Sequence, residues 1–258
     1  MALTYKEKML VTAAISMGLD RAEGHWDKVG QEMIKKAMAF EAAMIRADES
    51  VKPSQIPGHP MVSDGTPKVD EFIAMVVDMR KSSERLKTKV NSPVIKDGFQ
   101  RVYFETSALL PAISVVTSLE NGVVTEYLGD GALALFQVNK DDREETIREA
   151  NRVARNCIED MRNLINIELD NRYQLPSIDL GVGLSISKAM VTLVGALDNL
   201  HPKAIGECVW EATKLSGETN VVMVSSTLRK QWPQSKGGKM TFIHRTVRGV
   251  DGYRLSQT

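Results

Sequence analysis

Apolar residues recur along this chain of 258 residues in two spacings, and the spacing separates predicted helices from predicted strands. In residues 6–19 and 26–46 they recur three and four positions apart, which is the period of an amphipathic helix. Gly18 and Gly24 flank the point where one stretch gives way to the other, and they predict a break there. We therefore expect two helices near the start of the chain.

Shorter apolar runs in the rest of the chain predict strands that alternate with helices. Residues 71–78 form the clearest buried strand. Residues 123–136 predict a hairpin, because two β-type runs flank Gly-Asp-Gly. Helices are predicted over 99–119, where Pro111 implies a kink or a break, and over 141–170. The remaining predicted elements are a hairpin of 178–187 with 190–195, a helix from 206 to 214, and strands at 221–225, 240–243 and 252–255.

The order of these elements predicts the domain organisation and the fold class. Residues 51–67 contain four prolines and two glycines, which mark a linker. We expect residues 1–66 to form an N-terminal helical extension with this linker, and residues 67–258 to form the main domain. The order β-α-ββ-α-β, followed by extra strands, predicts an α+β fold with a ferredoxin-like core, in which helices cover an antiparallel sheet.

The charge balance and the cysteines narrow the class of protein. Because 33 Lys and Arg balance 33 Asp and Glu, no excess charge points to nucleic acid or to an anionic membrane. No run approaches the roughly 20 apolar residues of a membrane span, and the N-terminus lacks the features of a signal peptide. The two cysteines, Cys157 and Cys208, have no metal-ligand spacing. We expect a soluble cytoplasmic protein that binds neither nucleic acid nor membrane.

Two carboxylates stand at strand ends that should be neighbours in the sheet. Asp78 ends the first strand of the main domain, and Asp130 lies at the tip of the predicted hairpin. Carboxylates on adjacent strands can hold divalent ions, and such ions can handle a nucleoside triphosphate. The residues after Asp78 start a helix and could bind phosphate through free N–H groups: Arg80, Lys81, Ser82 and Ser83. An ordinary turn and an ordinary serine N-cap are the structural alternatives.

Three blocks in this order resemble the class III nucleotidyl cyclases. Residues 72–83 resemble the family's first metal strand and phosphate loop, and residues 127–136 resemble its second metal hairpin. Residues 180–187 with 204–216 resemble its glycine strand and its base and ribose helix. Residues 101–111 and 124–131 are similar to the bacterial pyrimidine cyclases of Pycsar antiphage systems, which make cyclic UMP or cyclic CMP to activate a cell-killing effector.

The resemblance implies a catalytic domain that depends on metal ions. Asp78, Asp130 and the backbone carbonyl of Met79 would hold two Mn²⁺ or Mg²⁺ ions, which suit such hard oxygen ligands. It also implies a homodimer with active sites at the interface. One chain would supply the metal half of each site and its partner the base half.

The resemblance also assigns residues to the half of the site that binds the base. At these positions the chain departs from the purine cyclases. The base-reading position, four residues before the second metal acid, is Glu126, and its partner position is Lys203. A carboxylate accepts from a ring N–H and an ammonium donates to a carbonyl oxygen. Uracil and guanine both match this pair, and cytosine fits it less neatly. The ribose-orienting position is Trp210, the transition-state position is Lys214, and a phosphate-binding position is Arg248.

We therefore expect a uridylate cyclase that converts UTP to 3′,5′-cyclic UMP and pyrophosphate, with Asp78, Asp130 and Lys214 as catalytic residues. Its role would be to produce the signal of an antiphage system, which a separate effector protein reads. The alternatives are a cytidylate cyclase, then a guanylate cyclase, then a non-catalytic nucleotide-sensing module. Two close carboxylates repel unless metal is bound, so the intact pair favours an enzyme.

Overall fold

The computed structural model describes residues 2–33, 51–196, 199–234 and 240–257. Its helices are α1 (Tyr5–Met33), α2 (Ser82–Lys87), α3 (Gly98–Ser118), α4 (Arg143–Asn156), the π-helix η1 (Cys157–Met161), α5 (Arg162–Tyr173), α6 (Glu207–Leu215) and α7 (Ser226–Lys230). Its strands are β1 (Val51–Pro53), β2 (Met61–Ser63), β3 (Lys68–Met79), β4 (Val123–Tyr127), β5 (Gly131–Gln137), β6 (Leu180–Ala196), β7 (Asn199–Gly206), β8 (Val222–Ser225), β9 (Met240–Val247) and β10 (Val250–Gln257). The part of the predicted helix 26–46 that follows Met33 lies outside the described residues.

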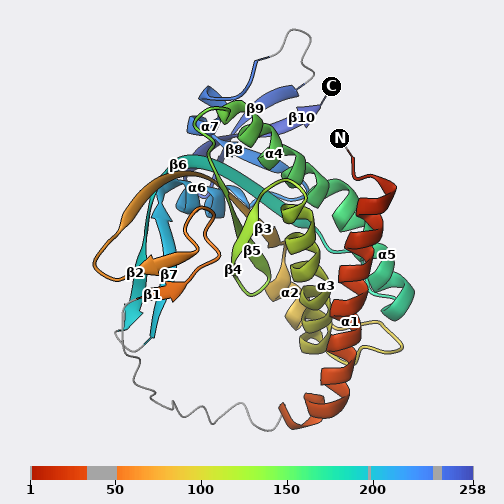
Figure 1. The fold of residues 1–258 in the computed structure, drawn as a ribbon. Helices are drawn as coiled ribbons and strands as arrows, with labels where there is room; N and C mark the ends of the chain where they lie inside the picture. Colours follow the sequence, from red (N-terminus) through yellow and green to blue (C-terminus); the bar gives the residue numbers. More distant parts are fainter. Residues whose placement is uncertain (1, 34–50, 197–198, 235–239, 258) are drawn as a thin grey trace.

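One eight-stranded sheet organises the molecule (Figure 1). Its strand order is β4-β5-β3-β6-β8-β10-β9, and β7 pairs with the second half of β6. β3 lies between β5 and β6 and is antiparallel to both. β6 and β8 run parallel, whereas the other strand pairs among the described residues are antiparallel. β1 and β2 form a small sheet of their own.

Side chains along β3 alternate between two apolar cores. The odd-numbered residues from Ile73 to Val77 face the core beneath α1, α3, α4 and α5. The even-numbered residues from Phe72 to Val76 face a smaller core beneath α6 and β7. Because both faces are buried, β3 is a continuous apolar run rather than an alternating one. The predicted α+β fold, an antiparallel sheet covered by helices, is confirmed, and α6 adds a helix on the second face.

The predicted hairpin of residues 178–187 with 190–195 is wrong. These residues belong to one strand, β6, and its hairpin partner is β7. Lys188 and Ala189, where we expected the turn, continue the ladder opposite Glu71 and Asp70 of β3. No glycine or proline separates the two halves at this point, and the exposed Lys188 meets solvent without breaking the strand.

The predicted break near Gly18 is also wrong, and α3 continues through Pro111 as one helix. A proline has no N–H for the carbonyl four residues earlier, which here is that of Ser107. This carbonyl oxygen faces α1, because a Cβ added at Gly18 would lie 2.1 Å from it. The glycine and the proline therefore mark a close contact between α1 and α3, and not the end of either helix.

Gly18→Ala should destabilise the fold, because the added methyl group has no room. Overpacking of this kind costs about 1–3 kcal/mol, which lowers the melting temperature by several degrees. Gly24→Ala in the same helix is the matched control, since nothing lies within 4 Å of its added Cβ. Alanine should stabilise the helix at Gly24 by up to about 1 kcal/mol. Thermal unfolding followed by circular dichroism measures both, and equal melting temperatures would contradict the α1–α3 contact.

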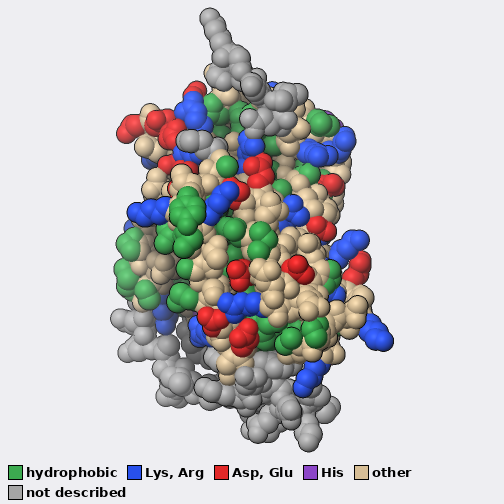
Figure 2. Space-filling model, turned by 90° about the vertical axis from the view of Figure 1, so that its right-hand side faces the viewer, with side chains coloured by type: hydrophobic (Ala, Val, Ile, Leu, Met, Phe, Trp, Pro, Cys, Tyr) green, Lys and Arg blue, Asp and Glu red, His purple; other side chains and the backbone are tan. Residues whose placement is uncertain are grey.

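The surface carries charges of both signs. Figure 2 shows Lys and Arg side chains interspersed with Asp and Glu on the face that lies to the right in Figure 1. This mixture agrees with the balanced composition of the chain. Among the described residues, no helix combines the length and the apolar character that crossing a membrane requires.

Both cysteines lie inside the fold as free thiols. Cys157 begins η1 and Cys208 lies in α6, and each has an exposed fraction of 0%. Burial raises the pKa of Cys157 to about 12 and also raises the pKa of Cys208. Reactive thiolate is therefore scarce at neutral pH for both residues.

Candidate functional site

The two predicted metal ligands lie on neighbouring strands at one end of the sheet. Asp78 of β3 is paired with Gly131 of β5, and Asp130 directly precedes Gly131. The backbone N–H of Met79 donates to the carbonyl of Asp130 over 3.0 Å, which fixes the hairpin tip against the end of β3. Burial raises the pKa of Asp78, and the nearby charge of Asp130 raises it further. The structure therefore brings the two acids together, as the sequence predicts.

Two arginines partly offset this concentration of negative charge. Arg80 forms an ion pair with Asp78, and its Nη1 also lies 3.5 Å from the carbonyl oxygen of Ser216. The Nε of Arg80 is buried and has no hydrogen-bond partner among the described residues. Arg248, in the turn between β9 and β10, lies close enough for its charge to favour ionised Asp78. Both predicted phosphate ligands thus lie beside the acid pair.

The donor set fits a divalent cation that is completed by other ligands. No cluster of three or more His, Cys, Asp and Glu side chains suited to a metal occurs in the described part of the chain. Asp78 and Asp130 would therefore be the side-chain ligands, with the Met79 carbonyl as the third oxygen donor. Carboxylate and carbonyl oxygens suit Mg²⁺ and Mn²⁺, and a cation would relieve the repulsion that raises the pKa of Asp78.

The predicted phosphate corner follows the acids directly. Lys81 occupies the N-cap position of α2 in the left-handed conformation, with φ of 59° and no side-chain cap hydrogen bond. The alternative of an ordinary serine N-cap is therefore wrong. Ser82 and Ser83 line a pocket of about 400 Å³ together with Gly129 and Asp130. The helix start and the hairpin tip thus face the same space.

The predicted base-reading residues contact each other within one chain. Glu126 lies in β4, just after a bulge at Thr125, and Lys203 lies in β7 opposite Thr192 of β6. Their side chains form an ion pair although they are 77 residues apart. Both remain partly exposed, at 23% for Glu126 and 37% for Lys203. The pair therefore presents an acceptor and a donor side by side to solvent.

Two glycines of β6, Gly181 and Gly183, allow α6 and the residues that follow it to lie close to this strand. A Cβ added at Gly183 would lie 2.1 Å from the carbonyl oxygen of Ala212. On the outer side of α6, Trp210 is 56% exposed and the Nζ of Lys214 lies 5.9 Å from its ring centroid. Trp210 thus presents much of its ring to solvent beside the ammonium group of Lys214.

Comparison with known proteins shows the fold. No protein-family model matches the chain, and no curated protein matches it in sequence. The structure of the guanylyl cyclase Cya2 superimposes with a TM-score of 0.58 at 17% identity, over 74% of this chain and 94% of its own. The adenylyl cyclase CyaB from P. aeruginosa gives 0.58 at 14% identity, over 75% of this chain and 97% of its own. A class III adenylyl cyclase-like ATP-binding protein from Pseudomonas aeruginosa gives 0.59 at 18% identity, over 81% of this chain and 43% of its own.

The chain has the class III cyclase fold. The sequence resemblance is thus confirmed at the level of the fold.

The cyclase fold also places residues at the pocket that the sequence reasoning missed. Phe99, Val102, Tyr103 and Thr106 of α3 line the space beside Ser82 and Asp130. Their spacing of i, i+3, i+4 and i+7 puts them on one helix face, so the helical pattern contained the signal. What the pattern lacked was the contact between this face and the hairpin tip.

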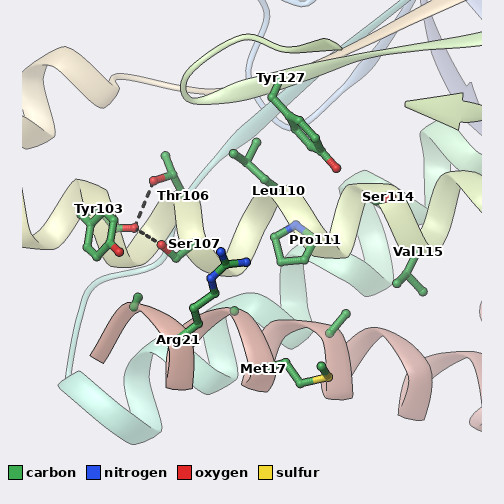
Figure 3. A pocket seen from close by; sticks show the side chains of 13 residues that line it. Met17, Arg21, Tyr103, Thr106, Ser107, Leu110, Pro111, Ser114, Val115 and Tyr127 are labelled. Carbon is green, nitrogen blue, oxygen red and sulfur yellow. Dashed lines mark hydrogen bonds between the residues drawn. The ribbon is translucent and has the colours of Figure 1, made fainter. Parts of the chain in front are cut away.

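A second groove of about 760 Å³ lies between α1, α3 and the central hairpin. Figure 3 shows Arg21 of α1 and Tyr127 of β4 on opposite sides of it, with Leu110 and Pro111 of α3 between them. The hydroxyl groups of Thr106 and Ser107 bond back to the carbonyl of Tyr103 in their own helix. No Asp or Glu lines this groove, so the metal chemistry belongs to the acid pair.

Arg80→Ala should tighten the binding of Mn²⁺ in the absence of nucleotide, because Arg80 competes with the metal for Asp78. We expect the dissociation constant to fall by roughly tenfold, which corresponds to about 1.4 kcal/mol. Electron paramagnetic resonance of free Mn²⁺ measures this directly. Arg143→Ala is the control, since Arg143 pairs with Glu71 nearer the start of β3. Unchanged or weaker Mn²⁺ binding by Arg80→Ala would contradict the competition.

Proposed function

We propose that this protein is a metal-dependent pyrimidine nucleotide cyclase that converts UTP to 3′,5′-cyclic UMP and pyrophosphate. The observation that carries the proposal is a cyclase fold with close Asp78 and Asp130 and a paired Glu126 and Lys203. CTP is the second candidate substrate and GTP the third. The carboxylate and ammonium pair fits uracil because uracil offers N3–H beside the O4 carbonyl.

In this reaction the ribose 3′-oxygen bonds to the α-phosphorus, and the bond from that phosphorus to the β-phosphate oxygen breaks. Pyrophosphate leaves and the hydroxyl proton passes to solvent. Divalent ions at Asp78, Asp130 and the Met79 carbonyl would supply acidity at the hydroxyl and neutralise phosphate charge. Through these ions, Asp78 and Asp130 would hold the 3′-hydroxyl and the α-phosphate together where β3 ends and β5 begins.

The remaining site residues bind and orient the nucleotide. The positive charges and hydroxyls after Asp78 would hold the triphosphate, with Arg248 beside them, and these residues are Arg80, Lys81, Ser82 and Ser83. Lys214 would act as a point charge on the reacting phosphate, since an ammonium lacks the guanidinium fork. Trp210 offers an exposed aromatic face for the base or the ribose.

We propose a homodimer, which the resemblance to class III cyclases implies. The 56% exposure of Trp210 supports it, because an exposed aromatic side chain on α6 is available to a partner. A partner that presents its α6 and its Glu126–Lys203 pair to Asp78 and Asp130 would complete the site. Two-fold symmetry then gives two equivalent sites.

Mixing two inactive variants tests this arrangement. Asp78→Ala removes the metal half, and Glu126→Lys removes the base half. A mixed dimer would contain one site built only from intact halves, so random assortment should restore about a quarter of the original activity. Each variant alone is the control. Sites contained in one chain would give no recovery on mixing.

The proposed cellular role is signalling in antiphage defence, within the cytoplasm, where a separate effector protein reads the cyclic nucleotide. Its support is the similarity of residues 101–111 and 124–131 to the pyrimidine cyclases of such systems. Fold alone does not assign this role. Loss of phage protection in cells that carry Asp130→Ala would support it.

An assay with all four nucleoside triphosphates tests the activity. Purified protein with Mn²⁺ is incubated with ATP, GTP, CTP and UTP in separate reactions, and products are identified by mass. We expect cyclic UMP as the main product. If the main product is a different cyclic nucleotide, the triphosphate that yields it is the substrate in place of UTP.

The second candidate is a nucleotide-binding module without turnover. The pairing of Arg80 with Asp78 favours it, since a cation of the chain itself already occupies one acid. One structure of the same fold is named a cyclase-like ATP-binding protein. Binding of a nucleotide by calorimetry, with all four triphosphates left intact in the assay, would establish this function instead.

A further inference from the structure

A buried cluster of charged side chains lies beside the candidate site. Glu105 of α3 is fully buried, with an exposed fraction of 0%. Its Oε2 accepts from the Nε of Arg85 over 2.9 Å, and its Oε1 accepts from the Nη2 of Arg85 and, over 2.9 Å, from the Nε of Arg101. Two guanidinium groups therefore share one carboxylate, in charge-assisted hydrogen bonds.

Arg85 joins three parts of the chain. It belongs to α2 and donates to the carboxylate of Glu105 in α3. It also donates to the carbonyl oxygens of Pro176 over 2.8 Å and Ser177 over 3.2 Å. These two carbonyls belong to the segment that leads into β6. One guanidinium thus fixes α2 between α3 and the entrance to the central sheet.

The short helix α2 depends on this cluster for its position. None of its six residues is buried, so no apolar side chain anchors it in the core. Its N-cap residue, Lys81, makes no side-chain cap hydrogen bond. The carbonyl of Leu86 also approaches Gly98 of α3 closely, since a Cβ added at Gly98 would lie 1.9 Å from its oxygen.

The position of α2 sets one wall of the candidate site. Ser82 and Ser83, its first residues, face Gly129 and Asp130 across the 400 Å³ pocket. A shift of α2 would move these residues relative to the acid pair and leave the acids themselves in place. Binding of the triphosphate would weaken more than the chemical step.

We propose that Glu105, acting through Arg85, is a positioning residue that holds the phosphate-binding corner of α2 against the hairpin tip. This role rests on the proposed function, because it assumes that the phosphate-binding corner of α2 binds a nucleoside triphosphate. Arg101 completes the cluster by holding the carboxylate of Glu105 in the orientation that Arg85 requires. The bidentate fork of Arg85 makes this contact specific for arginine.

The test compares Glu105→Gln with Glu120→Gln. Glu120 accepts from the Nε of Arg152 over 2.9 Å and from its Nη2 over 2.7 Å, so it is a second carboxylate held by an arginine fork, away from the site and 25% exposed. For Glu105→Gln we expect KM for the triphosphate to rise about tenfold with kcat changed less than about threefold. Glu120→Gln should leave KM unchanged. An unchanged KM in Glu105→Gln, or a loss confined to kcat, would overturn the proposal.

Hydrogen exchange on the free protein separates this proposal from the proposed function. The amides of α2 should exchange roughly ten times faster in Glu105→Gln than in Glu120→Gln, because local opening becomes easier. This readout needs no turnover, so it stands even if no triphosphate is cyclised. Equal exchange rates would overturn the positioning role. If Glu105→Gln does not fold, Arg85→Lys, which keeps the charge and loses the fork, replaces it in both measurements.

Discussion

Asp78→Ala and Asp130→Ala should each lower cyclisation of UTP by at least about a thousandfold, because each removes an oxygen ligand for the ions that activate the hydroxyl and neutralise the phosphates. The structure places Asp78 at the end of β3 and Asp130 beside it, directly before β5. Initial rates with Mn²⁺ and UTP, read by mass of the product, measure the loss. Asp141→Ala, at an exposed acid before α4, should keep full activity.

A third variant at the acid pair, Asp130→Asn, should separate activity from stability. Burial and the charge of Asp130 raise the pKa of Asp78, so the folded state binds a proton at Asp78 more tightly than the unfolded state does. Stability from this group is complete below the ordinary carboxyl pKa and is lost as pH rises through the raised value. Asp130→Asn removes one repelling charge, so its melting temperature at neutral pH should exceed that of the unchanged protein. Full activity of Asp130→Asn would show that the reaction does not need the carboxylate of Asp130.

Reversing the Glu126–Lys203 pair should reverse the choice of base. Glu126→Lys alone places two ammonium groups together and should lower activity with UTP by roughly a hundredfold. The double variant Glu126→Lys with Lys203→Glu restores an ion pair and exchanges donor for acceptor. Cytosine offers N3 as acceptor and its amino group as donor, which matches the exchanged pair.

We expect the ratio of CTP to UTP turnover to rise by about a hundredfold in this double variant. ATP should gain as well, since adenine offers the same pattern at N1 and its amino group. Competition between two triphosphates in one reaction measures the ratio. The exposed pair Glu144 and Arg148, exchanged in the same way, is the control. A double variant that still prefers UTP would show that Glu126 and Lys203 do not read the base.

Local patterns were sufficient for the parts of the fold that depend on neighbouring residues. The apolar run of β3 and the Gly-Asp-Gly turn predicted the central strand and its hairpin, and with them the meeting of Asp78 and Asp130. The apolar run and the turn are each determined within about ten residues, which is why the sequence alone revealed them.

Other features depend on contacts between distant segments. Gly18 and Pro111 looked like helix ends because each weakens a helix by itself, and only their meeting across α1 and α3 explains them. β6 appeared as two strands because the pairing with both β3 and β7 was unknown. The ion pairs of Arg80 and Glu105 were missed since charge alone does not say which partner a side chain will find. The division of the chain near residue 67 and the roles of the site residues stay predictions.

The burial of Cys157 and Cys208 makes this protein well suited to site-specific spectroscopy. Both thiols are buried and have raised pKa values, so a thiol-directed probe should not react with them at neutral pH. A single cysteine introduced at an exposed position such as Thr213 of α6 would then carry one label per chain. Pulsed dipolar measurements between two such labels would report how α6 of one protomer sits relative to α6 of the other, and how that distance changes when a nucleotide enters.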